Sequence, residues 1–289
     1  MASTKFHGAI TALVTPFKGK SIDAAAYKKL VEWQIKEGIN GLVPCGTTGE
    51  SPTLSMEEHN RVVEVCVQAT KGRVPVIAGA GSNSTAEAVA YTKHAKKAGA
   101  DAVLVVTPYY NKPTNKGLYL HYKAVSESAN IPIILYNIAG RTGKNIDPET
   151  MAKLASLKNI VGVKEASGNL EQMKQIKKLC PKDFLLISGD DALTLPIMEL
   201  GGVGVISVAS NLIPRDVATL VKTKDAKLNS KILKLVDALF IETNPIPVKT
   251  AAGLMGLCNP AMRLPMCEME DANLKTLKTA LKAYGLIKG

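Results

Sequence analysis

The chain of 289 residues contains few aromatic side chains and few arginines. Aromatic residues make up 4% of it, so its core must be built mainly from aliphatic side chains. Most of its 36 basic residues are lysines scattered along amphipathic segments such as 93-KHAKKAG-99, which is typical of solvated helix faces. The net charge is +11, but no basic block is interleaved with aromatics, so nucleic-acid binding is not favoured.

Paired cysteine motifs, a signal peptide and membrane-spanning runs are also missing. There is no C-x-x-C pair and no Cys/His cluster, which argues against a disulfide framework and a structural zinc. The N-terminal MASTKFHGAI lacks the apolar core of a signal peptide, and no apolar run approaches the length of a membrane span. We therefore expect a cytoplasmic protein with no membrane partner.

Short aliphatic runs that are apolar on both faces recur along the chain. This pattern is typical of parallel strands buried on both sides. Segments with helical spacing separate the runs, so the sequence predicts an α/β protein with a (β/α)8 TIM barrel. A doubly wound sheet is the alternative, but no glycine-rich phosphate-binding motif follows any run. The eight runs are 9-AITALVT-15, 40-NGLVPCG-46, 74-VPVIAGAG-81, 102-AVLVVTP-108, 131-IPIILYN-137, 159-NIVGVK-164, 184-FLLISG-189 and 202-GVGVISV-208.

Several predicted helices begin with recognisable caps. Capping boxes are expected at 55–58 and 84–87, and an aspartate cap followed by proline is expected at 147–148. The residues after the eighth run are too many for one barrel helix, and their pattern is largely helical. We therefore predict a barrel over residues 1–223 and a C-terminal helical extension, packed on the barrel, over residues 224–289.

The C-terminal ends of barrel strands are where a (β/α)8 active site lies. The polar groups there are hydroxyls, one amine and one guanidinium, and none of the ends carries a histidine. The acids near them, Glu50, Glu165, Asp190 and Asp191, form no obvious metal set. A Ser-His-Asp triad or a two-metal site is therefore not expected.

Lys164 ends the sixth run, and Tyr136 ends the fifth in a corresponding position. Neighbouring strands lie about 4.8 Å apart, so the two side chains can meet above the barrel. A buried lysine amine loses ammonium solvation, and its neutral form can attack a ketone to give an iminium, without a prosthetic group. The tyrosine hydroxyl can pass protons if Thr47, Thr48 or Tyr110 relays them.

Each of these residues also has an ordinary structural interpretation. Lys164 could extend its amine to solvent from the strand end, and Tyr136 could be a large strand residue whose hydroxyl is exposed to solvent. Thr47 and Thr48 lie between glycines and could serve a turn. Arg141, in a loop, could simply be solvated, although near a pocket it could bind a carboxylate. The combination of these residues indicates the proposed chemistry more specifically than any one of them does alone.

Taken together, these motifs resemble the dihydrodipicolinate synthase family. G-T-T-G-E-S, T-P-Y-Y-N, Y-N-x-x-x-R-T-G and G-x-K-E-A-S-G occur in the family's order and spacing, and 244-NPIPVKTA-251 matches as well. The resemblance implies a lyase that condenses pyruvate with L-aspartate 4-semialdehyde, the committed step toward diaminopimelate and lysine. It also implies a homotetramer built from tight dimers and no cofactor.

The resemblance assigns roles to the catalytic residues. Lys164 would form the Schiff base with pyruvate, and Tyr136 would be the proton donor and acceptor. Thr47 and Tyr110 would complete a relay to solvent, with Tyr110 reaching into the neighbouring subunit's site.

Four further positions would bind the substrates. Thr48 and the backbone at Ile206 would hold pyruvate, and Arg141 would bind the carboxylate of the semialdehyde. Gly189 is the fourth substrate-binding position. One departure falls in this region, because Ala139 stands where the family usually has proline. Alanine does not fix φ, so we expect a looser loop with the neighbouring roles intact.

A second departure concerns feedback inhibition by lysine, which many family members show at a dimer-interface cleft. Met56 stands where the feedback-sensitive pattern has histidine, and a thioether is only a weak acceptor. We therefore expect weak or absent inhibition. The positions that correspond to this allosteric site are Ser51, Met56, His59, Asn83, Glu87 and Tyr109.

Two alternatives to the synthase stay open at this point. A sibling aldolase, such as N-acetylneuraminate lyase or a 2-keto-3-deoxy-sugar-acid aldolase, would share Lys164, Tyr136 and the barrel. Thr47, Tyr110 and Arg141 discriminate against it, since Arg141 suits a short aldehyde that bears a carboxylate. A basic, non-enzymatic nucleic-acid-binding protein is the alternative from a different class.

Overall fold

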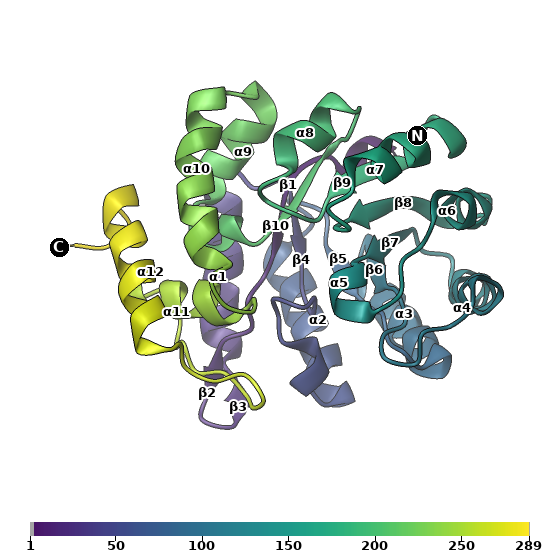
Figure 1. Cartoon of the computed structure of the whole chain (residues 1–289). Coiled ribbons are helices and arrows are strands. Elements are labelled where there is room, and N and C mark those ends of the chain that lie inside the picture. The colour runs from purple at the N-terminus through teal and green to yellow at the C-terminus, as the bar shows by residue number, and fades with distance from the viewer. Residues whose placement is uncertain (1–2, 289) are drawn as a thin grey trace.

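Eight parallel strands form the centre of the computed structural model, which describes residues 3–288. They are hydrogen-bonded in the order β4-β1-β10-β9-β8-β7-β6-β5, and a parallel bridge between Leu42 and Val76 closes the ring (Figure 1). The predicted barrel is confirmed. The strands are β1 (Gly8–Ala12), β4 (Gly41–Val43), β5 (Ile77–Gly79), β6 (Ala102–Val106), β7 (Ile133–Asn137), β8 (Ile160–Glu165), β9 (Leu185–Ser188) and β10 (Gly204–Ser207).

A helix follows each strand of the barrel, and these helices cover its outside (Figure 1). These helices are α1 (Ala24–Lys36), α2 (Met56–Thr70), α3 (Thr85–Ala98), α4 (Asn115–Ser128), α6 (Pro148–Ala155), α7 (Leu170–Leu179), α8 (Thr194–Glu199) and α9 (Pro214–Thr223). Smaller elements are the hairpin β2 (Phe17–Lys18) and β3 (Ser21–Ile22), the short helix α5 (Ala139–Thr142), and the 3-10 turns η1 (Ser3–Phe6), η2 (Ser51–Thr53) and η3 (Ala209–Asn211).

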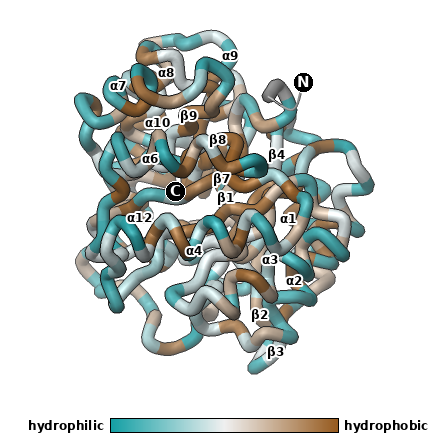
Figure 2. Tube along the Cα trace, turned by 90° about the vertical axis from the view of Figure 1, so that its right-hand side faces the viewer, coloured by the Kyte–Doolittle hydropathy of each residue, from teal (hydrophilic) through white to brown (hydrophobic). Residues whose placement is uncertain are grey.

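Apolar side chains fill both faces of the strands, as the aliphatic runs predicted. Ile10, Val43 and Ile134 belong to a cluster inside the ring, while a larger cluster fills the layer between strands and helices. Figure 2 shows this arrangement as hydrophobic strands surrounded by helices with hydrophilic outer faces. No helix within residues 3–288 is long and apolar enough to cross a membrane.

Two of the three predicted helix caps are confirmed. Ser55 and Glu58 form a complete capping box at the start of α2, and Asp147 accepts a hydrogen bond from the Thr150 amide at 2.8 Å. The capping box predicted at 84–87 is wrong. Glu87 instead accepts from the hydroxyl of Ser82, which also accepts from the Ser84 amide, so the preceding serine replaces Ser84 as the local partner.

Three additional helices follow the barrel, as predicted: α10 (Ala226–Leu239), α11 (Ile246–Leu254) and α12 (Asp271–Tyr284). They lie together on one side of the molecule, with α12 outermost (Figure 1). Leu235, Val248 and Leu277 belong to the same apolar cluster as the barrel helices, so the extension shares the barrel's core. The division between residues 223 and 224 stays a prediction.

Candidate active site

Lys164 and Tyr136 lie opposite each other on neighbouring strands. They are register partners on β8 and β7, and their exposed fractions are 6% and 5%. The Lys164 Nζ lies 4.1 Å from the centroid of the Tyr136 ring. The alternative in which Lys164 extends to solvent is therefore wrong, because the amine is buried against the aromatic ring.

A small enclosed cavity surrounds this pair at the C-terminal ends of the strands. Its volume is about 50 Å³, which is room for about four waters or a ligand of a few heavy atoms. Several strand ends that are far apart in the sequence meet at its wall. It is lined by Ala12, Val43, Gly46, Thr47, Thr48, Leu104, Tyr136, Ile138, Arg141, Lys164, Gly189, Val208, Phe240 and Asn244.

Gly189 makes room for the Lys164 side chain. A Cβ added at Gly189 would lie 3.0 Å from Lys164 Cε and 2.8 Å from Ala166 Cβ, so a larger residue would displace the amine. Ile206, by contrast, does not line the cavity. Its side chain is buried inside the barrel, and Val208, two residues later, reaches the wall instead.

Asn244, from the C-terminal extension, joins two of the predicted binding residues. Its Nδ2 donates to Thr48 Oγ1 at 3.0 Å, and its main-chain oxygen accepts from Arg141 Nη2 at 3.0 Å. Sequence reasoning missed this residue and Phe240. The motif 244-NPIPVKTA-251 was the available signal for Asn244. A role could not be assigned to it from the sequence, because the residues that Asn244 contacts were unknown.

Tyr110 lies outside this chain's own cavity. Its side chain is 88% exposed, and its backbone adopts the left-handed conformation with φ +69°. It follows β6, and it is not among the residues that line the cavity around Lys164. Its predicted role in a neighbouring subunit stays a prediction.

A network of polar side chains lies behind Lys164 and Tyr136, on the outer face of the same strands. Asn137 and Glu165 are register partners one position after Tyr136 and Lys164. The Asn137 Nδ2 donates to both Glu165 oxygens at 3.2 and 3.0 Å. Burial raises the pKa of Glu165, while hydrogen bonds from Asn137, Ser167 and Gln172 oppose that rise. These bonds hold the two strand ends together.

The family of the chain follows from comparison with known proteins. A model of the dihydrodipicolinate synthetase family matches residues 5–284. The chain belongs to this family. The family expectation drawn from the strand-end motifs is confirmed.

Full-length relatives of the family are similar to this chain throughout. A 4-hydroxy-tetrahydrodipicolinate synthase of Endomicrobium trichonymphae is 60% identical, with 98% of this chain and 100% of that protein covered. The crystal structure of dihydrodipicolinate synthase from Aquifex aeolicus superimposes with a TM-score of 0.97 at 47% identity, over 98% of this chain and all of that one. A chloride-inhibited family member from Acinetobacter baumannii, complexed with pyruvate, has a TM-score of 0.94 at 45% identity, over 97% and 99% of the two chains.

A second cavity of about 320 Å³ adjoins the active site and is partly lined by Thr47 and Arg141. Its wall includes four of the six positions that correspond to the family's lysine site, namely Ser51, His59, Glu87 and Tyr109. Met56 and Asn83 are not part of this wall. Burial lowers the pKa of His59 to about 4, so its imidazole is neutral at physiological pH.

Ala139, where the family usually has proline, is the first residue of α5. Proline is well accommodated at the first position of a helix, because the amide there has no partner within the helix. Alanine keeps the same helical turn, which is closed by a hydrogen bond from the Gly143 amide to the Ala139 oxygen at 2.9 Å. Arg141 is thus presented on a formed turn despite the substitution. The looser loop expected from alanine stays a prediction.

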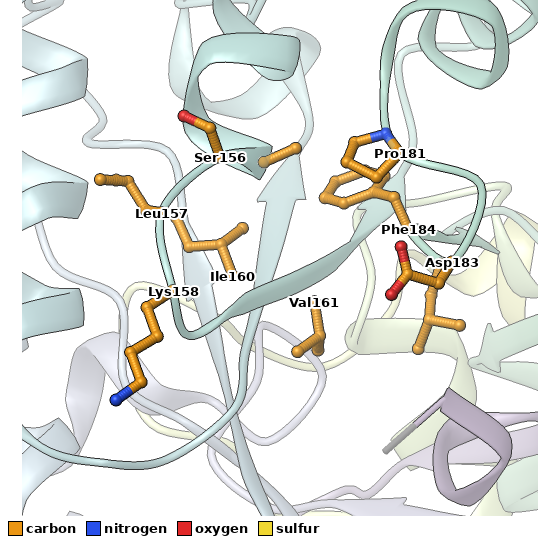
Figure 3. A pocket seen from close by; sticks show the side chains of 10 residues that line it. Ser156, Leu157, Lys158, Ile160, Val161, Pro181, Asp183 and Phe184 are labelled. Carbon is orange, nitrogen blue, oxygen red and sulfur yellow. The ribbon is translucent and has the colours of Figure 1, made fainter. Parts of the chain in front are cut away.

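A third cavity, of about 380 Å³, lies at the opposite ends of β8 and β9. Figure 3 shows Lys158 and Asp183 on opposite sides of this hollow, with Ile160, Val161 and Phe184 between them. Active sites of (β/α)8 barrels lie at the other face, and the polar groups here do not converge. Within residues 3–288, no three His, Cys, Asp or Glu side chains are placed to share a metal ion.

Proposed function

We propose that the Lys164 amine attacks the ketone of pyruvate and that the resulting adduct loses water to give an iminium. The iminium then loses a proton to form an enamine, which adds to L-aspartate 4-semialdehyde. The activity itself, that of a 4-hydroxy-tetrahydrodipicolinate synthase in the diaminopimelate route to lysine, follows from full-length relatives of 50% to 60% identity. The synthase prediction is confirmed, and the sibling aldolases and the nucleic-acid-binding protein are not supported. The roles of individual residues are our proposal.

One observation carries the assignment of the nucleophile. Lys164 places its amine in an enclosed cavity, over the Tyr136 ring, on the face of the barrel where chemistry occurs. Tyr136 is the proposed proton donor and acceptor, with Thr47 passing protons onward. Thr48 and Gly189 lie on the cavity wall, where they would contact a three-carbon acid, and the Ile206 backbone is proposed to assist.

A trapping experiment tests this proposal. The protein is incubated with pyruvate, reduced with borohydride and digested, and the adduct is mapped by mass spectrometry. We expect one modified peptide containing Lys164. An adduct at another lysine, or none, contradicts the mechanism. Turnover of aspartate semialdehyde but not of N-acetylneuraminate is expected in the same preparation, and the reverse would point to a sibling aldolase.

We propose that Arg141 binds the carboxylate of the semialdehyde. Replacing it with alanine removes a charged hydrogen-bond donor, so kcat/KM for the semialdehyde should fall about 10- to 100-fold. The borohydride-trapped pyruvate adduct should still form at the normal rate. Arg215→Ala is the matched control, since that arginine pairs with Glu37 away from the cavity. If Arg141→Ala also blocked the adduct, the division of roles would be wrong.

We further propose a cytoplasmic homotetramer built from tight dimers, in which Tyr110 completes the relay of a neighbouring chain. The 88% exposure of this side chain supports a role outside its own subunit. A tyrosine hydroxyl that relays protons must lie within hydrogen-bonding reach of its partner, so this proposal requires a second chain to supply the partner of Tyr110.

Lysine is expected to be a weak inhibitor or none. Four of the six expected residues line the larger cavity, but Met56 does not. Met56 is 41% exposed, and its thioether is only a weak hydrogen-bond acceptor. Half-inhibition should therefore require at least about 1 mM lysine, a binding free energy no stronger than about −4 kcal/mol. Steady-state assays at subsaturating pyruvate provide the measurement. A low-micromolar inhibition constant would show that Met56 does not weaken the site.

A further inference from the structure

A fully buried ion pair joins the C-terminal extension to the turn that precedes η2. Lys249 on α11 donates from Nζ to Glu50 Oε1, and the exposed fractions of the two side chains are 0% and 1%. Burying two charges is costly unless they are paired in good geometry and hydrogen-bonded further. Because both side chains are buried, the pair forms an interior contact between α11 and this turn.

The surrounding groups add further contacts to this pair. The second oxygen of Glu50 accepts from the Arg263 amide at 3.1 Å. Lys249 Nζ lies 4.0 Å from the centroid of the Phe17 ring, and the Arg263 guanidinium lies 4.4 Å from it. The guanidinium also donates to both oxygens of Glu58 at 2.6 Å. Burial lowers the pKa of Lys249, and the Glu50 carboxylate opposes that shift.

The pair acts on the turn that carries two residues of the active site. Glu50 has φ +56°, a left-handed conformation that is uncommon outside glycine, and its amide donates to the Thr47 oxygen at 3.1 Å. Thr47 and Thr48 line the catalytic cavity, whereas Lys249 does not. The extension therefore contacts this turn at two points: Lys249 is hydrogen-bonded to Glu50, and Asn244 is hydrogen-bonded to Thr48.

We propose that Lys249 is a positioning residue for the reaction, which acts through Glu50 to hold the Thr47 and Thr48 hydroxyls at the pyruvate subsite. This inference rests on the proposed function, since it concerns the same subsite. A purely structural ion pair would affect only the yield and stability of folded protein. A positioning pair also changes how well each folded molecule uses pyruvate.

Two variants separate these roles: Lys249→Met, which leaves Glu50 unpaired, and the double variant E50Q/K249M, which removes both charges. Activities are expressed per active site, counted by the borohydride-trapped adduct. For Lys249→Met we expect kcat/KM for pyruvate to fall about 10- to 100-fold, the size of loss that a displaced contact causes. The KM for the semialdehyde should stay unchanged, because Arg141 is held by the Asn244 main chain.

The double variant should recover the thermal midpoint, because removing both members of a buried pair is far less harmful than removing one. It should not recover kcat/KM for pyruvate. A double variant that regains both, or a Lys249→Met protein with wild-type pyruvate kinetics, overturns the proposal. Arg73→Met is the control, since it breaks an exposed ion pair with Glu32 and should leave the kinetics unchanged.

Glu50→Asp decides the matter if neither methionine variant folds. Aspartate tolerates the left-handed conformation and keeps both charges, but its carboxylate is one methylene further from Lys249. We expect a reduced kcat/KM for pyruvate, and a wild-type value overturns the proposal. A wild-type protein that forms no adduct at Lys164 would instead overturn the proposed function, so the two failures are distinguishable.

Discussion

Replacement of Lys164 with methionine is expected to abolish the pyruvate adduct and to lower kcat at least about 10⁴-fold, as losses of a covalent nucleophile do. Methionine nearly keeps the length of the side chain but has no amine, so no iminium can form. The measurement combines borohydride trapping with an assay of aspartate semialdehyde consumption. The substituted side chain should still pack against Tyr136, so the protein should remain folded.

Lys174→Met is the matched control for this experiment. Lys174 lies on α7, is 56% exposed and pairs with Glu171, so its loss should change neither the adduct nor kcat. A Lys164→Met protein that still acquires a pyruvate mass after reduction would mean that another amine carries the reaction. Lys249 would then be the first to consider, although it does not line the cavity.

Replacement of Tyr136 with phenylalanine is expected to lower kcat about 100- to 1000-fold, the range typical of a lost general acid and base. The ring that lies 4.1 Å from Lys164 Nζ remains, so packing around the amine is preserved. The adduct should still accumulate, but more slowly, because proton transfer then depends on water. The rate of adduct formation is measured by adding borohydride to samples at increasing times and quantifying the reduced adduct.

Tyr122→Phe controls for the loss of a buried tyrosine hydroxyl. Tyr122 is fully buried and donates to the Val105 oxygen at 3.3 Å, on the helix side of the sheet. Its replacement should lower stability slightly without changing kcat. If Tyr136→Phe behaved in the same way, the tyrosine would be a packing residue and another group would move the protons.

The barrel and the adjacency of Lys164 and Tyr136 could be predicted because both depend on local patterns. Runs that are apolar on both faces indicate strands covered on both sides, and their alternation with helices leaves few folds. The meeting of Tyr136 with Lys164 followed from equivalent positions in neighbouring runs, and the register confirms it. Ser84 shows the limit of such patterns, since a nearby serine competed for the same partner.

Contacts between distant segments could not be predicted. Asn244 bonds to Thr48 across 196 positions, and Lys249 to Glu50 across 199, and no local periodicity connects them. A lysine in a helical segment such as 244-NPIPVKTA-251 resembles any solvated lysine until the facing residue is known. Tyr110 is a further example, because a single sequence does not specify which surface of a second copy it meets.

The Glu50–Lys249 pair also has a consequence for synthesis of the protein. Glu50 leaves the ribosome 199 residues before its counterion, an interval of about 10 to 40 seconds at about 5–20 residues per second. The last barrel strand ends at Ser207, so the whole ring of strands is translated before Lys249 exists. The turn with Thr47 and Thr48 thus gains its partners Asn244 and Lys249 only after the whole ring has been translated, so the proposed pyruvate site is completed late in synthesis.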